Sequence, residues 1–309
     1  MEDTNGSATP VPNVDTNQAS SQEQAPPPLD ERIQKALDKA LYGGGHPAAQ
    51  KARNFLNGTW LGEPLHVVLT DLPVGAWTVA MVFDALEATV GGRKFAQAAD
   101  TSVAIGIAAA AGAAVTGLTD WSDVDPPARR RGFVHGLLNL GGTALFVTSL
   151  VLRRNKARKS GRVVGILGYG LMSYAAHLGG KMVYEQRVGV DRTAGQVFPE
   201  SFTAVMEESA LADGKPTKVM YQGTPILLVR RGQRLFAMAD TCSHFSGPLS
   251  EGQLEGDSIV CPYHFSKFSL EDGRVINGPA VHKQPCLDVR ARDGKIEVRR
   301  PPTPDPSYL

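Results

Sequence analysis

The sequence predicts two domains of different kinds, a bundle of four membrane-spanning helices followed by a domain of short strands and loops. Four long apolar segments occupy the first part of the chain. The second part combines strand-like runs, turn-forming glycines and prolines, and a regular spacing of cysteine and histidine residues. The chain of 309 residues is long enough to hold both domains.

The two ends of the chain are polar. Residues 1–29 are rich in Ser, Thr, Asn, Gln and Pro, which offer little apolar surface to bury, so we expect a disordered tail. Residues 301–309 form a similar Pro-rich tail. No apolar run near the start predicts a cleavable signal peptide. The formal net charge of +1 gives no electrostatic reason to expect a nucleic-acid partner.

Residues 30–60 are predicted to form an amphipathic helix and a linker. Ile33, Ala36 and Leu37 share one face of the helix, and charged residues occupy the other. Such a helix either lies on a membrane surface or packs on the next domain, and the sequence leaves both possibilities open.

Residues 61–190 are predicted to form a four-helix membrane domain. Its apolar segments cover about 66–90, 100–119, 133–152 and 163–181, and each is close to the roughly 20 residues that cross the apolar core of a bilayer. Small residues recur at every fourth position in the second segment, which is typical of close helix packing in lipid. A soluble bundle of buried helices is the alternative, and the short charged connectors favour the membrane.

The connectors predict an orientation for a multi-pass protein of the cell membrane. The third connector carries Arg153, Arg154, Lys156, Arg158, Lys159 and Arg162, and the first carries Arg93 and Lys94. The positive-inside rule places both connectors on the cytoplasmic side, so the C-terminal domain would lie on the non-cytoplasmic side. Three arginines at 129–131 in the second connector oppose this assignment, although aspartates accompany them.

Three histidines fall at the end of the bundle that continues into the C-terminal domain. His66 opens the first segment, His135 opens the third, and His177 closes the fourth. Ionisable groups inside a span are costly and tend to mark a site. Two of these imidazoles could ligate a b-type haem, or they could bind a quinone headgroup. A zinc ion held with Asp71 or Asp120, or plain polar contacts between helices, remain as alternatives.

The most specific pattern in the chain is Cys242-Ser-His244 followed, after sixteen residues, by Cys261-Pro-Tyr-His264. Two thiolates and two imidazoles can hold a binuclear iron–sulfur cluster, with the thiolates on one iron and the imidazoles on the other. Zinc also binds two cysteines and two histidines. In zinc fingers, however, the two cysteines usually form one short motif and the two histidines another, whereas here each motif carries one cysteine and one histidine. Neutral imidazoles make the cluster less negative, so the pattern predicts one-electron transfer.

From about residue 214 to 300 the chain resembles the Rieske [2Fe–2S] domain family. The matching stretches are 223–230, 242–249, 261–264, 272–273, 278–280 and 293–298. The resemblance implies an antiparallel all-β domain, which we place at 191–300, with the cluster at its tip between two loops. It also implies that Cys242 and Cys261 ligate the buried iron, and that His244 and His264 ligate the iron on the solvent side.

Departures from the family pattern predict the reduction potential. High-potential members carry a disulfide between the two loops, but Gly247 and Tyr263 stand at those positions here. Ser266 is expected to donate a hydrogen bond to a cluster sulfur, whereas Phe268 replaces a tyrosine and has no hydroxyl. Fewer such bonds lower the potential. We therefore expect a ferredoxin-like centre of low to intermediate potential. Phe265 replaces a small residue, so we expect the packing of its loop to differ from that of the family.

The third cysteine, Cys286, lies outside both loops in an extended run. We expect a small buried apolar side chain there, as is common for cysteines without a ligand role. The cysteine content therefore indicates nothing about an oxidising compartment.

The helical half resembles a predicted four-helix membrane family of unknown function, through 64–67, 72–75, 135–136 and 179–184. The two resemblances together predict a membrane-anchored one-electron carrier, surrounded by lipid, that relays electrons between a redox partner protein and a haem or quinone. The alternative is a ferredoxin-like component that serves a soluble oxygenase or reductase, with the helices as a passive anchor. A quinone-linked oxidoreductase is a third possibility. No facial triad for a mononuclear iron is evident, so we expect an electron-transfer protein rather than a stand-alone enzyme.

Overall fold

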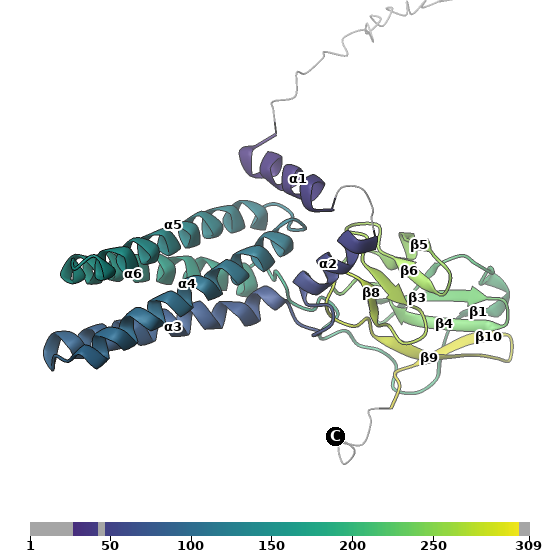
Figure 1. Cartoon of the computed structure of the whole chain (residues 1–309). Helices are drawn as coiled ribbons and strands as arrows, with labels where there is room; N and C mark the ends of the chain where they lie inside the picture. The colour runs from purple at the N-terminus through teal and green to yellow at the C-terminus, as the bar shows by residue number, and fades with distance from the viewer. Residues whose placement is uncertain (1–26, 43–46, 303–309) are drawn as a thin grey trace, which may run out of the picture.

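The computed structural model describes residues 27–42 and 47–302, which form a helical part followed by a β domain (Figure 1). The tails expected at 1–29 and 301–309 lie outside the described residues, apart from their innermost positions. The order of helices and strands confirms the predicted fold class.

Six α-helices occur within the described residues. They are α1 (Leu29–Tyr42), α2 (Pro47–Asn57), α3 (Leu65–Thr89), α4 (Arg93–Trp121), α5 (Ala128–Arg154) and α6 (Arg158–Tyr184). Helices α3 to α6 correspond to the four predicted segments and form the bundle that extends away from the β domain in Figure 1. Helix α1 contacts the connection between α4 and α5, where Gln34 donates hydrogen bonds to the carbonyls of Trp121 and Val124.

The expectation of four apolar spans needs correction. By length and composition, three of the described helices could cross a membrane, namely α3, α4 and α5. Helix α6 has 27 residues, the same number as α5. It begins with Arg158 and Lys159, carries Arg162 and Lys181, and includes six glycines. Helix α6 nevertheless packs in the bundle as the predicted fourth helix.

The bundle consists of two helical hairpins, α3–α4 and α5–α6, that repeat one arrangement. Three contacts between α3 and α5 join residues that are 69 positions apart: His66 with His135, Trp77 with Phe146, and Asp84 with Arg153. The Trp77 and Phe146 rings stack at 4.0 Å between centroids, in the middle of the bundle core. Equivalent residues of the two hairpins therefore meet each other along one axis.

The second helices of the hairpins repeat with a separation of 62 positions. Gly106, Ala113 and Gly117 of α4 correspond to Gly168, Ala175 and Gly179 of α6. A Cβ atom at Gly106 would lie 2.2 Å from the Trp77 ring nitrogen, and one at Gly168 would lie 3.3 Å from the Phe146 ring. Glycine at both positions thus makes room for the stacked rings. The separation is 69 residues for α3 and α5 and 62 residues for α4 and α6. The difference of seven residues is about two helical turns, so equivalent residues of the two hairpins still lie on the same side of their helices.

The β domain contains ten strands and two short 3₁₀ helices. The strands are β1 (Thr203–Glu207), β2 (Thr217–Tyr221), β3 (Thr224–Arg231), β4 (Arg234–Ala239), β5 (Gln253–Leu254), β6 (Ser258–Val260), β7 (Lys267–Ser269), β8 (Val275–Asn277), β9 (Cys286–Arg292) and β10 (Lys295–Arg299). The 3₁₀ helices are η1 (Glu208–Ala210) and η2 (Leu249–Glu251). One sheet has the order β1-β10-β9-β4-β3-β2 and the other β5-β6-β7-β8. All paired strands are antiparallel, which confirms the implied all-β domain.

Turn chemistry fixes the register of the larger sheet. Gln222 and Gly223 link β2 to β3, and Asp293 and Gly294 link β9 to β10; all four have positive φ. Two-residue turns of this kind match the twist of a hairpin and favour an Asp-Gly or related pair. The sheet is therefore held by local sequence signals, which leaves the longer connections free to form a site.

Candidate metal centre

Two loops with the same backbone design carry the predicted ligands. The first loop follows β4 and the second joins β6 to β7. The N–H of Cys242 donates to the carbonyl of Gly247 at 2.9 Å, and the N–H of Cys261 donates to the carbonyl of Ser266 at 2.9 Å. Each cysteine thus begins a loop that is closed by a hydrogen bond five residues on.

The fourth residue after each cysteine adopts a left-handed backbone conformation. Ser246 has a φ of 62° and Phe265 a φ of 61°. This conformation costs a residue with a side chain roughly 1 kcal/mol or more. The Phe265 side chain is 72% exposed, so its bulk extends outward and does not crowd the loops. The two loops therefore accommodate Phe265 without crowding.

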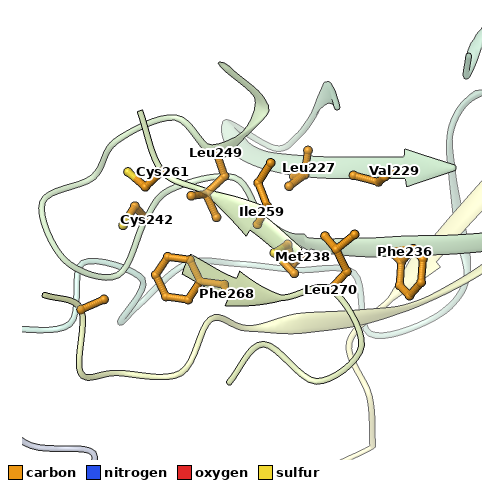
Figure 2. Packing of buried hydrophobic residues seen from close by; sticks show 11 residues of the cluster. Leu227, Val229, Phe236, Met238, Cys242, Leu249, Ile259, Cys261, Phe268 and Leu270 are labelled. Carbon is orange, nitrogen blue, oxygen red and sulfur yellow. The ribbon is translucent and has the colours of Figure 1, made fainter. Parts of the chain in front are cut away.

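The two cysteine sulfurs lie next to each other in the core of the β domain. Cys242 and Cys261 are buried against Leu249, Ile259 and Phe268, as Figure 2 shows. Backbone N–H groups donate to both sulfurs, those of His244 and Phe245 to Cys242, and those of Tyr263 and His264 to Cys261. Such donors stabilise thiolates, the form that binds metal.

The hydrogen bond between the two cysteine sulfurs shifts their pKa values in opposite directions. It lowers the pKa of Cys261 to about 7 and raises the pKa of Cys242 well above its usual range. A buried sulfur pair of this kind is ready to lose protons when a metal binds.

The two histidines also converge. The ring centroids of His244 and His264 are 5.0 Å apart and the ring planes are almost perpendicular. Nδ1 of His244 is buried and has no hydrogen-bond partner among the described residues. Burial keeps the pKa of His244 well below its usual value, so its ring is neutral. A neutral imidazole with a vacant buried nitrogen is suited to metal ligation.

His264 is oriented by a residue from the helical part. Its Nε2 lies 3.4 Å from Oδ2 of Asp125, in the connection between α4 and α5. This contact leaves Nδ1 of His264 as the ring nitrogen for a metal, the same atom that is vacant in His244. The residues present therefore fit a binuclear cluster with two thiolates and two imidazoles.

A single metal ion fits the geometry less well. Within residues 27–42 and 47–302, no three His, Cys, Asp or Glu side chains gather closely enough to hold one ion. A binuclear cluster needs only two protein ligands at each iron, whereas a structural zinc ion needs four at one point. The geometry favours iron–sulfur over zinc.

Other buried polar residues hold the loops. The Ser266 hydroxyl accepts a hydrogen bond from the N–H of Ala280 at 2.9 Å, and its own proton stays available. Donation of that proton to a cluster sulfur remains a prediction. Gln284, which sequence analysis missed, is fully buried; it accepts from the N–H of Ser243 and donates to the carbonyl of Thr241. No sequence pattern distinguishes this glutamine from a surface one.

Cys286 differs from the two ligands. It lies at the start of β9, half-buried, and burial raises its pKa to about 11. It is therefore a neutral thiol at physiological pH.

We expect Cys286→Ser to leave the cluster intact, because this sulfur is neither ionised nor part of the two loops. Iron content and the electron paramagnetic resonance (EPR) signal of the reduced protein should match those of the parent chain. Cys242→Ser is the comparison, and it should lose both. A Cys286 variant without cluster would contradict this assignment.

The β domain contacts the helical part through the region around the candidate centre. In α2, Asn54 accepts from the N–H of Gly278 at 2.9 Å and donates to the carbonyl of Ile276 at 3.2 Å. His282 donates through Nε2 to the carbonyl of Gly189, which follows α6. Figure 1 shows α2 between the bundle and the strands. The histidine edge of the centre therefore lies on the side of the bundle.

The structure brings together two of the three predicted helix histidines. The ring centroids of His66 and His135 are 6.4 Å apart. His177 is exposed on the outside of α6, with its ring against Tyr174. It lies two positions after the buried Ala175, and two positions correspond to nearly opposite sides of a helix.

Comparisons with known proteins agree with both halves. Residues 201–289 match the Rieske [2Fe-2S] domain family. Residues 62–192 match a family described as predicted membrane protein (DUF2231).

Similar proteins cover the β domain. The ferredoxin component of biphenyl 2,3-dioxygenase from Rhodococcus jostii (strain RHA1) is 34% identical over 97 residues, 31% of this chain and 86% of that protein. The ferredoxin subunit of 3-phenylpropionate/cinnamic acid dioxygenase from Photorhabdus laumondii is 37% identical over 99 residues, 31% of this chain and 90% of that protein. The solved ferredoxin of carbazole 1,9a-dioxygenase from Nocardioides aromaticivorans IC177 is 26% identical, over 33% of this chain and 100% of that one, with a TM-score of 0.31.

The paired loops bring together two cysteine sulfurs and two imidazoles, and the relatives match the domain that holds them over most of their length. The chain belongs to the Rieske [2Fe–2S] family, as an electron carrier with a DUF2231 domain upstream of its Rieske domain.

Proposed function

We propose that this protein is a membrane-anchored one-electron carrier whose Rieske cluster, of low to intermediate potential, exchanges electrons at the end of the helical bundle. One observation carries the proposal: His264, the predicted ligand of the outer iron, faces Asp125 of the α4–α5 connection. Electrons leave such a cluster most readily by its histidine edge, and this edge lies on the side of the bundle. A haem or a quinone at the bundle end would be the next carrier.

The outward surface of the bundle supports anchoring in lipid. Large apolar side chains remain exposed on all four helices, among them Val67, Leu72, Val82, Ile105, Val115, Leu137, Leu140, Val163, Ile166 and Leu167. Only 17% to 22% of the most apolar windows of α3, α4 and α5 is buried inside the protein. In water, so much exposed apolar surface would cause aggregation, whereas in a bilayer it contacts lipid tails.

Charge pairing supports the predicted orientation, with the Rieske domain on the non-cytoplasmic side. Arg129 pairs with two acidic residues of α1, and Arg131 pairs with Glu185. Two of the three arginines that oppose the positive-inside rule are thus held by carboxylates, and Arg130 is the exposed one on that side. Arg154 and Lys156 remain exposed in the connector assigned to the cytoplasm.

The surroundings of the sulfurs support a low to intermediate potential. Phe268 is fully buried beside the cysteines and offers no hydroxyl to a sulfur. Gly247 and Tyr263 cannot form the disulfide of high-potential relatives. Fewer donors leave the reduced cluster less stabilised.

A second candidate function is a ferredoxin-like component that serves a soluble oxygenase or reductase, with the helices as a passive anchor. Two proteins similar to the β domain favour this function, because they are ferredoxin components of dioxygenases. Tyr263 and Phe265 also favour it, since they flank His264 and their side chains are 55% and 72% exposed. Exposed aromatic residues are frequent anchors of protein interfaces.

The proposal is tested on the full-length chain. We expect it to remain in membranes after a carbonate wash, and a potentiometric titration followed by EPR should show one electron per chain. Release into the supernatant would overturn the anchoring, and the absence of a one-electron signal would overturn the carrier.

The same protein, reconstituted in phospholipid vesicles and reduced with dithionite, separates the two candidates. Reoxidation by decylubiquinone in the bilayer and by cytochrome c in solution is followed by stopped-flow absorption. The first candidate predicts that Tyr263→Ala and Phe265→Ala leave the quinone rate unchanged. The second predicts fast electron transfer only to the soluble protein, slowed several-fold by both substitutions.

A further inference from the structure

The bundle end beneath the Rieske domain holds two imidazoles that the iron–sulfur cluster does not use. His66 lies near the start of α3, and His135 lies in the equivalent place in α5. They belong to the repeat that pairs residues 69 positions apart, so they meet on the axis that relates the two hairpins. A single ligand bound on this axis would therefore be contacted by one imidazole from each hairpin.

Each ring is held by the same two residues of the second helix of its hairpin. Nδ1 of His66 donates to the carbonyl of Ala113, and Nδ1 of His135 donates to the carbonyl of Ala175, both at 2.8 Å. Four residues after each alanine stands a glycine, against which the ring packs. In both hairpins the imidazole thus has the same two contacts, a backbone carbonyl that accepts its proton and a glycine against which it packs.

The glycines are needed for this support. A Cβ atom at Gly117 would lie 2.7 Å from Cε1 of His66, which is closer than real contacts allow. A Cβ atom at Gly179 would lie 3.2 Å from Cε1 of His135. Both second helices therefore leave room for an imidazole ring at the same place.

The hydrogen bonds fix the tautomer. A backbone carbonyl only accepts, so Nδ1 carries the proton in both rings and Nε2 carries the lone pair. Histidines that ligate metals are commonly oriented in this way, with the other ring nitrogen donating to a carbonyl. A ligand of this pair must therefore take up the Nε2 lone pairs, as a metal centre does by coordination and a hydrogen-bond donor such as Asn139 does for His135.

The separation of the rings also fits a shared metal. A metal–imidazole bond of about 2.0 to 2.1 Å, with roughly 1.1 Å from nitrogen to ring centre, gives centroids about 6.2 to 6.4 Å apart across one metal ion. The observed distance is 6.4 Å, with ring planes at 89°.

We infer that His66 and His135 form a two-imidazole site for a metal centre, the iron of a haem. Within the described part of the chain, no third His, Cys, Asp or Glu joins them. A bare ion would need further ligands from water, whereas a macrocycle brings its own and takes an imidazole on each side. The inference rests on the proposed function and names the carrier that would exchange electrons with the cluster.

One residue must move for such a centre to bind. Nδ2 of Asn139 donates to Nε2 of His135 at 3.1 Å and to the carbonyl of the same histidine at 3.0 Å. Both contacts lie within one turn of α5, so the amide can turn away without breaking a contact between helices. Asn139 then caps the lone pair only while no metal is present.

The test uses the full-length chain, purified in detergent from cells supplied with a haem precursor. We expect sharp haem bands in the reduced-minus-oxidised spectrum, a pyridine haemochrome of about one haem per chain, and one iron beyond the two of the cluster. His66→Ala and His135→Ala should each lower haem content at least tenfold. The matched control His177→Ala, at an exposed position, should keep it, and Asn139→Leu should bind at least as much haem as the parent chain.

The EPR signal of the Rieske cluster in every variant reports that the chain is folded and that the proposed function stands. A normal cluster signal without haem bands would overturn the haem assignment, whether or not a bare metal ion is found by elemental analysis. Haem that survives both histidine substitutions would overturn the site. Absence of the cluster signal from the parent chain would instead overturn the proposed function.

Discussion

Arg153→Met should destabilise the helical bundle by about 3 to 5 kcal/mol, the range expected when one partner of a buried ion pair is removed. The Arg153 side chain is fully buried near the end of α5. It forms a two-pronged ion pair with Asp84 of α3, and its Nη1 also lies 3.2 Å from Oδ1 of Asp100 in α4. Methionine would leave Asp84, whose side chain is only 9% exposed, with the more distant Arg158 alone, whose Nη2 lies 3.8 Å from Oδ1 of Asp84.

Thermal unfolding of the detergent-solubilised chain, followed by circular dichroism, measures the effect. Arg154→Met is the matched control, because the neighbouring side chain is exposed and should change stability little. Combining Arg153→Met with Asp84→Leu should recover most of the loss, since the pair is then replaced by apolar groups of similar size. Equal stability of the Arg153 and Arg154 variants would contradict the role of this ion pair.

The convergence of the four predicted ligands was predictable from sequence because they lie in two short loops. Each loop carries its cysteine and histidine within four residues, so the spacing itself encodes the ligand geometry. The order of the four long helices was predictable for a similar reason, since apolar segments and charged connectors alternate along the chain, but the helices extend into the connectors beyond the apolar segments. The single misplaced histidine, His177, was assigned by its depth in the bundle, and depth does not say which side of a helix a residue faces.

The duplication of the hairpins was not visible in the sequence. Its axial pairs differ in chemistry, Trp77 with Phe146 and Asp84 with Arg153, so the two halves show few identical residues even though their packing repeats. Of the three axial pairs, His66 and His135 alone are identical in the two halves. The contact of Asp125 with His264 was equally hidden, because it joins residues 139 positions apart through the docking of two domains.

Gly247→Ala should abolish assembly of the iron–sulfur cluster. A Cβ atom at this position would lie 2.7 Å from Sγ of Cys261 and 3.0 Å from the ring of Tyr263, both in the opposite loop. The carbonyl of Gly247 accepts the N–H of Cys242, so the backbone cannot withdraw without opening the first loop. Overpacking a rigid site commonly costs about 1 to 3 kcal/mol, and here the displaced atom is itself a ligand.

Iron content and the EPR signal of the reduced chain measure this loss, and we expect both cluster readouts to fall at least tenfold. Ser246→Ala is the control, because it changes the adjacent, exposed residue of the same loop without adding an atom. Adding Tyr263→Ala to Gly247→Ala removes the ring but not the sulfur. If the sulfur is the obstacle, this double variant stays without cluster, whereas recovery would show that the ring alone was crowded. Glycine at position 247 thus leaves the space that the Cys261 sulfur of the opposite loop occupies.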